Sequence, residues 1–360
     1  MTLEQCWHAV PGGTAVAALE LARELHARDD VEVVGVAARH SSPPPADWTP
    51  PIAVRHLWAP RPVLYELWHA RLPGVDVERA TGPVDVVHGT AVAFPRAAAP
   101  VVMTIHDLAF LTDPSTVTRH GLRFFRRGTE LARTRAGLVL CSSRATMDEC
   151  VIAGFDESKL RLVPLGVRVD PASDDDVARA QAAYGIERPY VLFTGTVEPR
   201  KNLPRLLRAF ARLDRTDVDL VLVGPSGWKE SLHDDLGAIE SRVRMTGFVG
   251  QRDRDALVAG ARAFCYPSLK EGFGLPVLEA MAQGTPVVTS RGTSTEEVAG
   301  DAALLIDPKD EGSIAQAIES ILDDHALADR LSNAGRARAA TFTWERTAEA
   351  VVAAYREAAA

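Results

Sequence analysis

Short apolar, β-branched runs alternate with helical patterns through the first half of the chain. The runs are VEVVGVA (31–37), VDVVHG (84–89), PVVMTIHD (100–107) and AGLVLCS (136–142). Runs of this length that are apolar on both faces are typical of buried parallel strands. A helical spacing of apolar residues joins Ala15, Ala18, Leu19, Ala22 and Leu25. Strands that alternate with helices predict an α/β fold with a doubly wound parallel sheet.

The alternation stops at RVDPASDDD (168–176), which is polar, acidic and contains a proline, as linkers often do. It then restarts. The apolar runs of the second half are YVLFTGT (190–196), VDLVLVG (218–224), AFCYPS (263–268) and TPVVTS (285–290). We therefore expect a first α/β domain over 1–168, a linker over 169–187 and a second domain over 188–341. Residues 342–358 are amphipathic at helical spacing and predict a C-terminal helix.

Composition agrees with a two-domain globular protein. The chain has 360 residues, of which 46% are hydrophobic and 24% charged, and this length exceeds what one ordinary core supports. The net charge of −8 argues against a general nucleic-acid binder, which needs a basic face. Four cysteines lie far apart, so we expect reduced thiols in the core. Without an apolar run of about 20 residues or a signal-like start, a cytoplasmic location is expected.

Two carboxylates stand in the apolar segment EGFGLPVLEAMAQGTPVV, which begins at Glu271. Pro276 suits the first turn of a helix and Gly284 suits the residue just past its end, so PVLEAMAQ is predicted to be a short helix. Glu271 then lies in the preceding loop and Glu279 about one turn inside the helix. Free N–H groups and the helix dipole attract anions to the space before such a helix. The alternative is that both are ordinary solvated acids.

Several motifs resemble those of one enzyme family. PSLKEGFGLPVLEAMAQGTPVV (267–288) resembles the signature of the retaining nucleotide-sugar glycosyltransferases of family 4. The other similar stretches are VPGGT (10–14), TIHDLAFLTDPS (104–115), YVLFTGTVEPRKNL (190–203) and MTGFV (245–249). The resemblance implies the GT-B fold, in which two Rossmann-like doubly wound domains face each other across a cleft. It makes 1–168 the acceptor-side domain and 188–341 the nucleotide-sugar domain, with the helix at 342–358 packing back on the first.

The resemblance also implies roles for individual residues. His106 and Glu271 would be catalytic, His106 by contact with the transferred sugar and Glu271 by contact with its hydroxyls. Glu279 would bind the ribose. Arg200 and Lys201 would neutralise the donor diphosphate, although Thr196 stands where many family members have a further arginine. The remaining expected donor contacts are Gly12, Gly13, Gly272, Phe273, Gly274 and Leu275, and the expected base contacts are Phe248 and Val249.

The implied reaction is transfer of a hexose to a glycan or lipid-linked acceptor with retention of configuration. The subgroup with GT-x-x-PRKN and HDLAF is associated with GDP-mannose, which we favour as donor. We expect a front-face transfer in which the leaving phosphate helps to deprotonate the acceptor. Neither a metal nor a cofactor is expected, because Arg200, Lys201 and helix dipoles supply the positive charge.

Alternatives remain open at this point. A nucleotide-sugar 2-epimerase shares the two-domain architecture, and a non-catalytic sugar-nucleotide sensor would share the motifs. A lone histidine such as His106 is often structural. Residues 118–135 form a basic amphipathic segment that contains Phe124 and Phe125. This segment fits peripheral contact with the inner face of a membrane, and equally a surface helix with buried phenylalanines.

Overall fold

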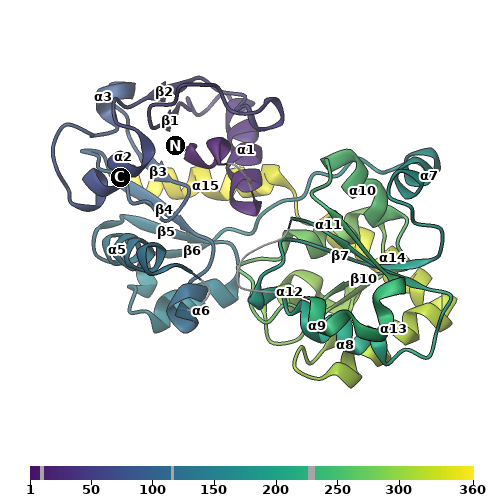
Figure 1. The fold of residues 1–360 in the computed structure, drawn as a ribbon. Coiled ribbons are helices and arrows are strands. Elements are labelled where there is room, and N and C mark those ends of the chain that lie inside the picture. Colours follow the sequence, from purple (N-terminus) through teal and green to yellow (C-terminus); the bar gives the residue numbers. More distant parts are fainter. Residues whose placement is uncertain (9–11, 115–116, 226–231) are drawn as a thin grey trace. The chain divides into compact units, whose positions relative to one another are not determined.

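The computed structural model describes residues 1–8, 12–114, 117–225 and 232–360, which form two compact units (Figure 1). Unit 1 comprises Met1–Gly166 and Thr343–Ala360, and unit 2 comprises Val167–Phe342. Val10 and Pro11 of the N-terminal glycine motif and Ser115 of the histidine motif lie outside the described residues. Each unit is considered below by itself.

Unit 1 is built on a parallel sheet. Its strands are β1 (Gly35–Ala37), β2 (Val54–His56), β3 (Val87–Gly89), β4 (Val101–Ile105), β5 (Leu138–Cys141) and β6 (Leu160–Leu162). The last four pair in the order β3-β4-β5-β6, and β1 pairs with β2. Residues 1–3 join the two groups, since the N–H of Leu3 bonds to Val36 O and that of Thr2 to His88 O, both at 2.9 Å. The sequence patterns did not predict this segment or β2 as strands.

Helices cover both faces of the unit 1 sheet. They are α1 (Gly13–His26), α2 (Arg61–His69), α3 (Glu78–Thr81), α4 (Ala109–Thr112), α5 (Arg119–Arg135), α6 (Arg144–Ile152) and α15 (Trp344–Ala359). Side chains alternate along β5: Leu138 and Leu140 pack in the core under α1 and α15, whereas Val139 and Cys141 pack on the opposite side. Burial on both faces explains why the strands are continuous apolar runs.

Unit 2 contains a six-stranded parallel sheet in the order β12-β11-β10-β7-β8-β9. The strands are β7 (Tyr190–Thr194), β8 (Asp219–Val223), β9 (Val243–Gly247), β10 (Ala263–Tyr266), β11 (Val287–Ser290) and β12 (Leu304–Ile306). The strand order reverses direction between β7 and β10. In open parallel sheets ligands bind beyond the carboxyl ends of the strands at such a reversal. The loops after β7 and β10 are therefore where the fold itself favours a ligand.

The helices of unit 2 include one in the segment expected to be a linker. They are α7 (Asp174–Ala183), α8 (Leu203–Ala211), α9 (His233–Leu236), α10 (Gln251–Ala259), α11 (Leu275–Gln283), α12 (Ser294–Ala299), α13 (Glu311–Asp323) and α14 (His325–Ala339). Helix α7 corrects the linker expected over 169–187. Ser173 and Asp176 form a capping box at its start, and the acidic run that suggested a linker suits the first turn of a helix.

The basic helix α5 turns its two phenylalanines into the protein. The Phe124 ring stacks on those of Tyr65 and His69, with centroids 5.4 and 4.5 Å apart, and Phe125 lies 5.2 Å from Phe110. Both phenylalanines pack against the unit 1 core, which agrees with the surface-helix alternative. Among the described residues, no helix combines the length and the apolar character needed to cross a membrane.

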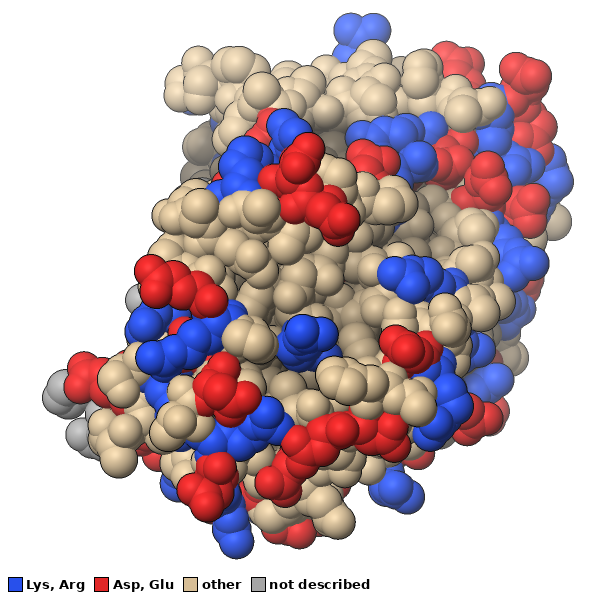
Figure 2. Space-filling view, turned by 90° about the vertical axis from the view of Figure 1, so that its right-hand side faces the viewer, with Lys and Arg blue, Asp and Glu red and all other residues tan. Residues whose placement is uncertain are grey.

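Two further sequence inferences concern thiols and surface charge. All four cysteines are buried, which confirms their predicted place in the core. On the face seen in Figure 2, Lys and Arg side chains are interspersed with Asp and Glu. That face therefore has no broad basic patch of the kind that nucleic-acid phosphates require.

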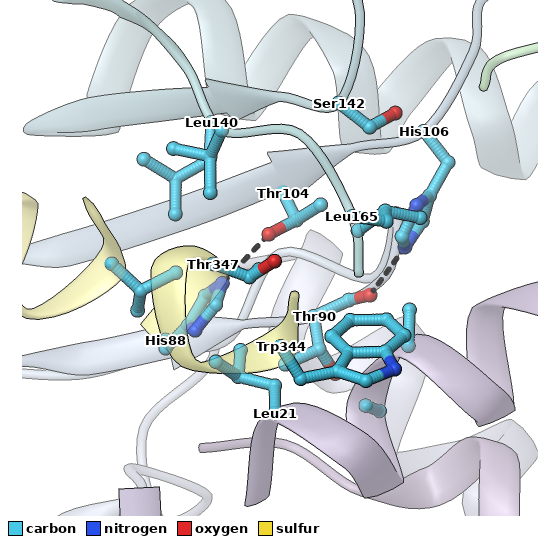
Figure 3. Close-up of a pocket in the computed structure, with 14 residues that line it drawn as sticks. Leu21, His88, Thr90, Thr104, His106, Leu140, Ser142, Leu165, Trp344 and Thr347 are labelled. Atoms are coloured by element: carbon cyan, nitrogen blue, oxygen red, sulfur yellow. Dashed lines mark hydrogen bonds between the residues drawn. The ribbon is translucent and has the colours of Figure 1, made fainter. Parts of the chain in front are cut away.

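Helix α15 is tied to the sheet through a buried histidine. His88 on β3 bonds through Nδ1 to the Tyr355 hydroxyl at 2.7 Å. Its Nε2 bonds to Thr104 Oγ1 at 2.8 Å (Figure 3). Only 2% of His88 is exposed. Burial lowers the pKa of His88 to about 3, because the charged imidazolium would lose its water.

We predict that His88 stays neutral in the folded protein when the pH falls well below 6. The unfolded chain binds a proton near pH 6.5, so the folded state loses stability as the pH falls from about 6.5 towards 3. His88→Gln should reduce this acid-induced loss by up to about 1.4 kcal/mol per pH unit. Urea denaturation at pH 7, 6 and 5 measures this loss of stability, with a substitution at the exposed His325, His325→Gln, as control. Equal pH dependence in parent and His88→Gln would contradict the prediction.

Candidate functional site

The loops that follow β7 and β10 are bonded to each other at the reversal in strand order. Asn202 begins α8 in the left-handed conformation, with φ of 64°. Its side-chain amide donates to Pro267 O at 3.0 Å and to Pro308 O at 2.6 Å. The N–H of Leu269 donates to Arg200 O at 2.8 Å. These bonds hold the PRKN segment against the start of the EGFG loop.

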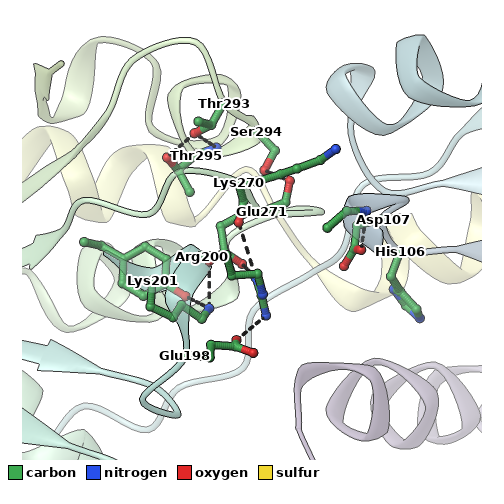
Figure 4. Close-up of polar contacts among 12 residues, drawn as sticks. His106, Asp107, Glu198, Arg200, Lys201, Lys270, Glu271, Thr293, Ser294 and Thr295 are labelled. Atoms are coloured by element: carbon green, nitrogen blue, oxygen red, sulfur yellow. Dashed lines mark hydrogen bonds and ion pairs between the residues drawn. The ribbon is translucent and has the colours of Figure 1, made fainter. Parts of the chain in front are cut away.

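A cluster of four charged side chains lies in these two loops (Figure 4). Glu271 accepts from Arg200 Nη1 and from Lys201 Nζ, each at 2.7 Å, and Arg200 also pairs with Glu198 at 2.8 Å. The Glu271 and Lys201 side chains are both only 8% exposed. The structure thus brings together three residues that the sequence singled out, and it adds Glu198, which the sequence did not single out.

The cluster fixes the protonation of Glu271. Burial by itself raises the pKa of this carboxyl group, but the neighbouring Lys201 and Arg200 outweigh burial and lower the pKa to about 2. Burial in turn lowers the pKa of Lys201, against the opposing effect of Glu271. At neutral pH Glu271 is therefore a carboxylate that accepts hydrogen bonds and has no proton to give.

The helix predicted after this loop is present. Helix α11 begins at Leu275, one residue before its predicted start at Pro276. It ends before Gly284, which adopts φ of 81°. Gly274 precedes it with φ of 108°, and a Cβ there would lie 2.8 Å from Thr295 Cγ2. Phe273 is buried against Phe342, so only its backbone can face a ligand. Gly272 is also buried.

Glu279 on α11 has a partner that sequence reasoning missed. Arg254 Nη2 lies 3.2 Å from Glu279 Oε1 and 3.3 Å from Asp255 Oδ1. Burial raises the pKa of Glu279, and the Arg254 charge opposes that rise. Arg254 belongs to α10, which starts directly after the expected base-binding turn. Nothing in the run QRDRD separates Arg254 from its solvated neighbours, so no sequence signal could have identified it.

The expected base-binding turn follows β9. Phe248 is 68% exposed, which is unusual for so large an apolar side chain, whereas Val249 is buried. An exposed aromatic ring suits stacking on a flat base. The Val249 side chain packs inside the protein, so this residue can contribute only its backbone.

His106 lies in unit 1, immediately after β4. Its Nε2 lies 3.2 Å from the carbonyl oxygen of Thr90. Since a carbonyl only accepts, Nε2 carries the proton and Nδ1 is the acceptor in the neutral ring. Burial lowers the pKa of His106, which favours that neutral form.

A small cavity adjoins His106 within unit 1. It is lined by His106, Thr104, Ser142 and Trp344 among others and measures about 20 Å³ (Figure 3). This is room for about one water molecule, and a sugar ring does not fit. Two of the expected glycine contacts, Gly12 and Gly13, are in the same unit: Gly12 caps α1, and Gly13 is the first residue of that helix. A side chain at Gly12 would meet open space.

Comparison with known proteins identifies the family of this chain. The family model described as "Glycosyltransferase Family 4" matches residues 11–171 and that described as "Glycosyl transferases group 1" matches 174–338. O-antigen chain mannosyltransferase B of Escherichia coli is 33% identical over an alignment of 281 residues, with 75% of this chain and 74% of that protein covered. The chain belongs to the family 4, group 1 glycosyltransferases. This makes it an enzyme of the transferase class, against the epimerase and sensor alternatives.

Further relatives of this glycosyltransferase cover more of the chain. The MMP alpha-(1->4)-mannosyltransferase of Mycolicibacterium hassiacum is 31% identical over 84% of the chain and 76% of its own length. The D-inositol 3-phosphate glycosyltransferase of Acidothermus cellulolyticus is 30% identical, with 97% and 86% covered. Anabaena Alr3699/HepE, crystallised with UDP and glucose, has a TM-score of 0.76 at 19% identity, with 96% of each chain covered. The fold is therefore GT-B, with two Rossmann-like α/β domains.

We predict that removing Lys201 alone lowers the free energy of unfolding more than removing the charges of Lys201 and Glu271 together. Lys201→Met leaves Glu271 buried without one partner and should lower the free energy of unfolding by about 3–5 kcal/mol. Adding Glu271→Gln should recover part of the loss. Arg212→Met, at an exposed pair with Glu311, is the control and should cost less than about 1 kcal/mol. Urea denaturation gives the values. A double variant no more stable than Lys201→Met would show that the two charges are not coupled.

A second prediction concerns the pair of Arg254 and Glu279. Arg254→Met removes the cation that opposes the raised pKa of Glu279, so Glu279 should be protonated up to a higher pH. Binding of a nucleoside diphosphate should then weaken by about tenfold or more at pH 6 and recover as the pH rises. Calorimetry at pH 6, 7 and 8 tests this. Arg252→Met, on the same helix and 78% exposed in its side chain, is the control. Parent-like affinity of Arg254→Met at pH 6 would rule out a nucleotide role for this pair.

Proposed function

We propose that this glycosyltransferase moves a hexose from a nucleotide sugar to a glycan or lipid-linked acceptor with retention of anomeric configuration, GDP-mannose being the favoured donor. The observation that carries the proposal is the charged cluster of Glu271, Arg200 and Lys201 at the strand-order reversal of unit 2. The mannosyltransferase relatives support mannose as the sugar, while the structural neighbour with UDP makes uridine donors the comparison to test.

The cluster suits a diphosphate that gains negative charge as the glycosidic bond breaks. Arg200 can hold phosphate oxygens with two parallel N–H groups, and Lys201 adds a compact positive charge. Both side chains are already ordered by Glu271 and Glu198, so little reorganisation is needed when the donor arrives. Preset charges of this kind stabilise a transition state more than mobile ones do. We propose that they replace a divalent metal.

Glu271 and His106 suit contact with the sugar. Glu271 is ionised and can only accept, so it would receive hydrogen bonds from donor-sugar hydroxyls while it keeps Arg200 and Lys201 in place. The neutral His106 presents Nδ1 as an acceptor and would bind a hydroxyl of the transferred hexose. No protein group is then required as a nucleophile, and the departing phosphate oxygen accepts the proton of the acceptor hydroxyl in a front-face transfer.

The nucleoside would bind at the pair of Glu279 and Arg254 and at the turn after β9. Glu279 would accept from the vicinal ribose hydroxyls, as carboxylates do in dinucleotide sites, with Arg254 holding it ionised. The exposed Phe248 would stack on the base.

Two further parts of the proposal concern unit 1. Gly12 and Gly13 are proposed to close on the donor phosphate or the acceptor. Contact of residues 118–135 with the inner face of a membrane is also a proposal, and the inward-facing Phe124 and Phe125 do not support it.

The proposal is tested first with nucleotides and then with one variant. GDP-mannose should raise the melting temperature more than UDP-glucose does, and transfer should persist after exhaustive chelation. His106→Ala should leave the affinity for GDP unchanged and cut transfer by roughly 10²-fold or more. His120→Ala, an exposed histidine on α5, is the control. A folded His106→Ala protein that transfers at the parent rate would exclude the proposed sugar contact, and activity that returns only with magnesium or manganese would exclude the metal-free reaction.

A further inference from the structure

A second and larger pocket lies in unit 1, apart from the small cavity beside His106. Its volume is about 410 Å³, which is within the range of small-molecule sites. Three aromatic rings, those of Trp7, His40 and His56, form part of its wall. The rest comes from the strands nearby and from residues 41–50, including Ser41, Ser42, Pro43, Pro44, Thr49 and Pro50.

The three rings are held in place by their neighbours. Trp7 and His40 are stacked with centroids 4.6 Å apart, and His56 meets Trp7 edge-on at 5.5 Å. The Trp7 indole N–H donates to Ser42 O at 3.0 Å, which fixes the indole against the proline-rich loop. His56 Nδ1 bonds to Ala38 O at 2.7 Å. A wall with fixed rings loses little conformational entropy when a ligand binds.

A buried carboxylate, that of Glu4, lies behind this aromatic wall. Glu4 is only 3% exposed; its Oε1 lies 2.9 Å from His40 Nε2, and its Oε2 accepts from the N–H of Ala38 at 2.8 Å. Burying a carboxylate is costly unless it is paired and hydrogen-bonded. Here Oε2 is hydrogen-bonded to the backbone that leads into His40, and Oε1 lies next to the His40 ring nitrogen but forms no hydrogen bond within the described part of the chain. The carboxylate thus holds the backbone from which the His40 ring projects.

The pocket lies along the strand edge that also carries His106. His40 follows β1, His56 is the last residue of β2, and His106 follows β4, so all three are at carboxyl ends of parallel strands. Hydrogen bonds connect the two places: His106 bonds to Thr90 O, and Gln5 Nε2 donates to Thr90 Oγ1 at 2.8 Å. Gln5 and Trp7 belong to the same 3₁₀ turn, Glu4–Trp7. The 3₁₀ turn that carries Trp7 therefore also bonds, through Gln5, to Thr90, the residue that His106 contacts.

The lining chemistry selects one kind of ligand. None of the described residues that line this pocket is a lysine or arginine, which disfavours a phosphate or another anion. Aromatic faces carry partial negative charge and attract the polarised C–H groups on one face of a pyranose ring. The Ser41, Ser42 and Thr49 side chains can exchange hydrogen bonds with the hydroxyl groups at the ring's edge. A neutral sugar ring matches this combination.

We propose that this pocket is an acceptor subsite that binds a neutral pyranose ring of the glycan, beyond the sugar that receives the transferred hexose. The inference rests on the proposed function in one respect, namely that the acceptor is a glycan. It implies that acceptors of two or more sugars are used better than single sugars, because the second ring adds binding at the aromatic wall.

The test follows the Trp7 indole N–H by NMR, with its resonance assigned by Trp7→Phe. The probes are methyl α-D-mannopyranoside, α-linked mannobiose and mannotriose, and neutral disaccharides of glucose, galactose and N-acetylglucosamine. At least one disaccharide or trisaccharide should shift the resonance saturably. The indole of Trp58, which is 61% exposed and outside the pocket, should not respond. No saturable Trp7 response from any probe, or an equal response of Trp58, would overturn the subsite.

A kinetic arm uses His56→Ala, whose side chain is exposed and lies outside the proposed donor site. We expect its KM for the responding oligosaccharide to rise tenfold or more, with unchanged donor affinity and unchanged donor hydrolysis. Trp58→Ala should behave as the parent. If Trp7 responds to sugars but GDP-mannose does not bind, the donor proposal fails and the subsite stands. If the donor binds and His56→Ala has a parent-like KM, the subsite alone fails.

Discussion

The buried contact of Glu271 with Arg200 and Lys201 is the interaction on which the site in unit 2 depends. A carboxylate and an ammonium group that are each 8% exposed would be strongly destabilised alone, and each makes the burial of the other tolerable. Their pairing also joins the loops after β7 and β10, so the geometry of the strand-order reversal and the charge of the site are set by the same contacts. The consequence is that the two cations and their partners hold fixed positions before any ligand binds.

The two units contribute different chemistry. Unit 2 holds ionised groups whose charges nearly cancel in the described cluster, together with the Glu279–Arg254 pair and the exposed ring of Phe248. Unit 1 holds neutral, hydrogen-bonding groups: the lowered pKa values of His88 and His106 keep imidazoles uncharged beside the sheet. Under the proposed function, unit 2 would thus supply the charge stabilisation, and unit 1 would supply neutral acceptors and aromatic rings.

Sequence reasoning succeeded where local rules determine structure. Pro276 and Gly284 marked the ends of α11 because one lacks an N–H and the other tolerates positive φ, and continuous apolar runs marked the central strands because both faces are covered. It failed where partners are distant in sequence. Arg254 acquires its role only through folding, since Glu279 lies on another helix. Glu198 was missed although its partner Arg200 is only two residues away. The acidic start of α7 was misread because the same residues favour both linkers and helix N-termini.

Unit 1 is discontinuous along the chain, whereas unit 2 is one uninterrupted segment. The face of the unit 1 sheet under α15 uses Ala348, Val351 and Val352, which the ribosome adds after all of unit 2. Until then Val102, Leu138 and Leu140 lack part of their cover. During synthesis unit 2 can therefore complete its core first, although it is encoded second. Residues 1–166 therefore expose apolar surface until the C-terminal helix has been made. During that time chaperone binding or aggregation competes with folding.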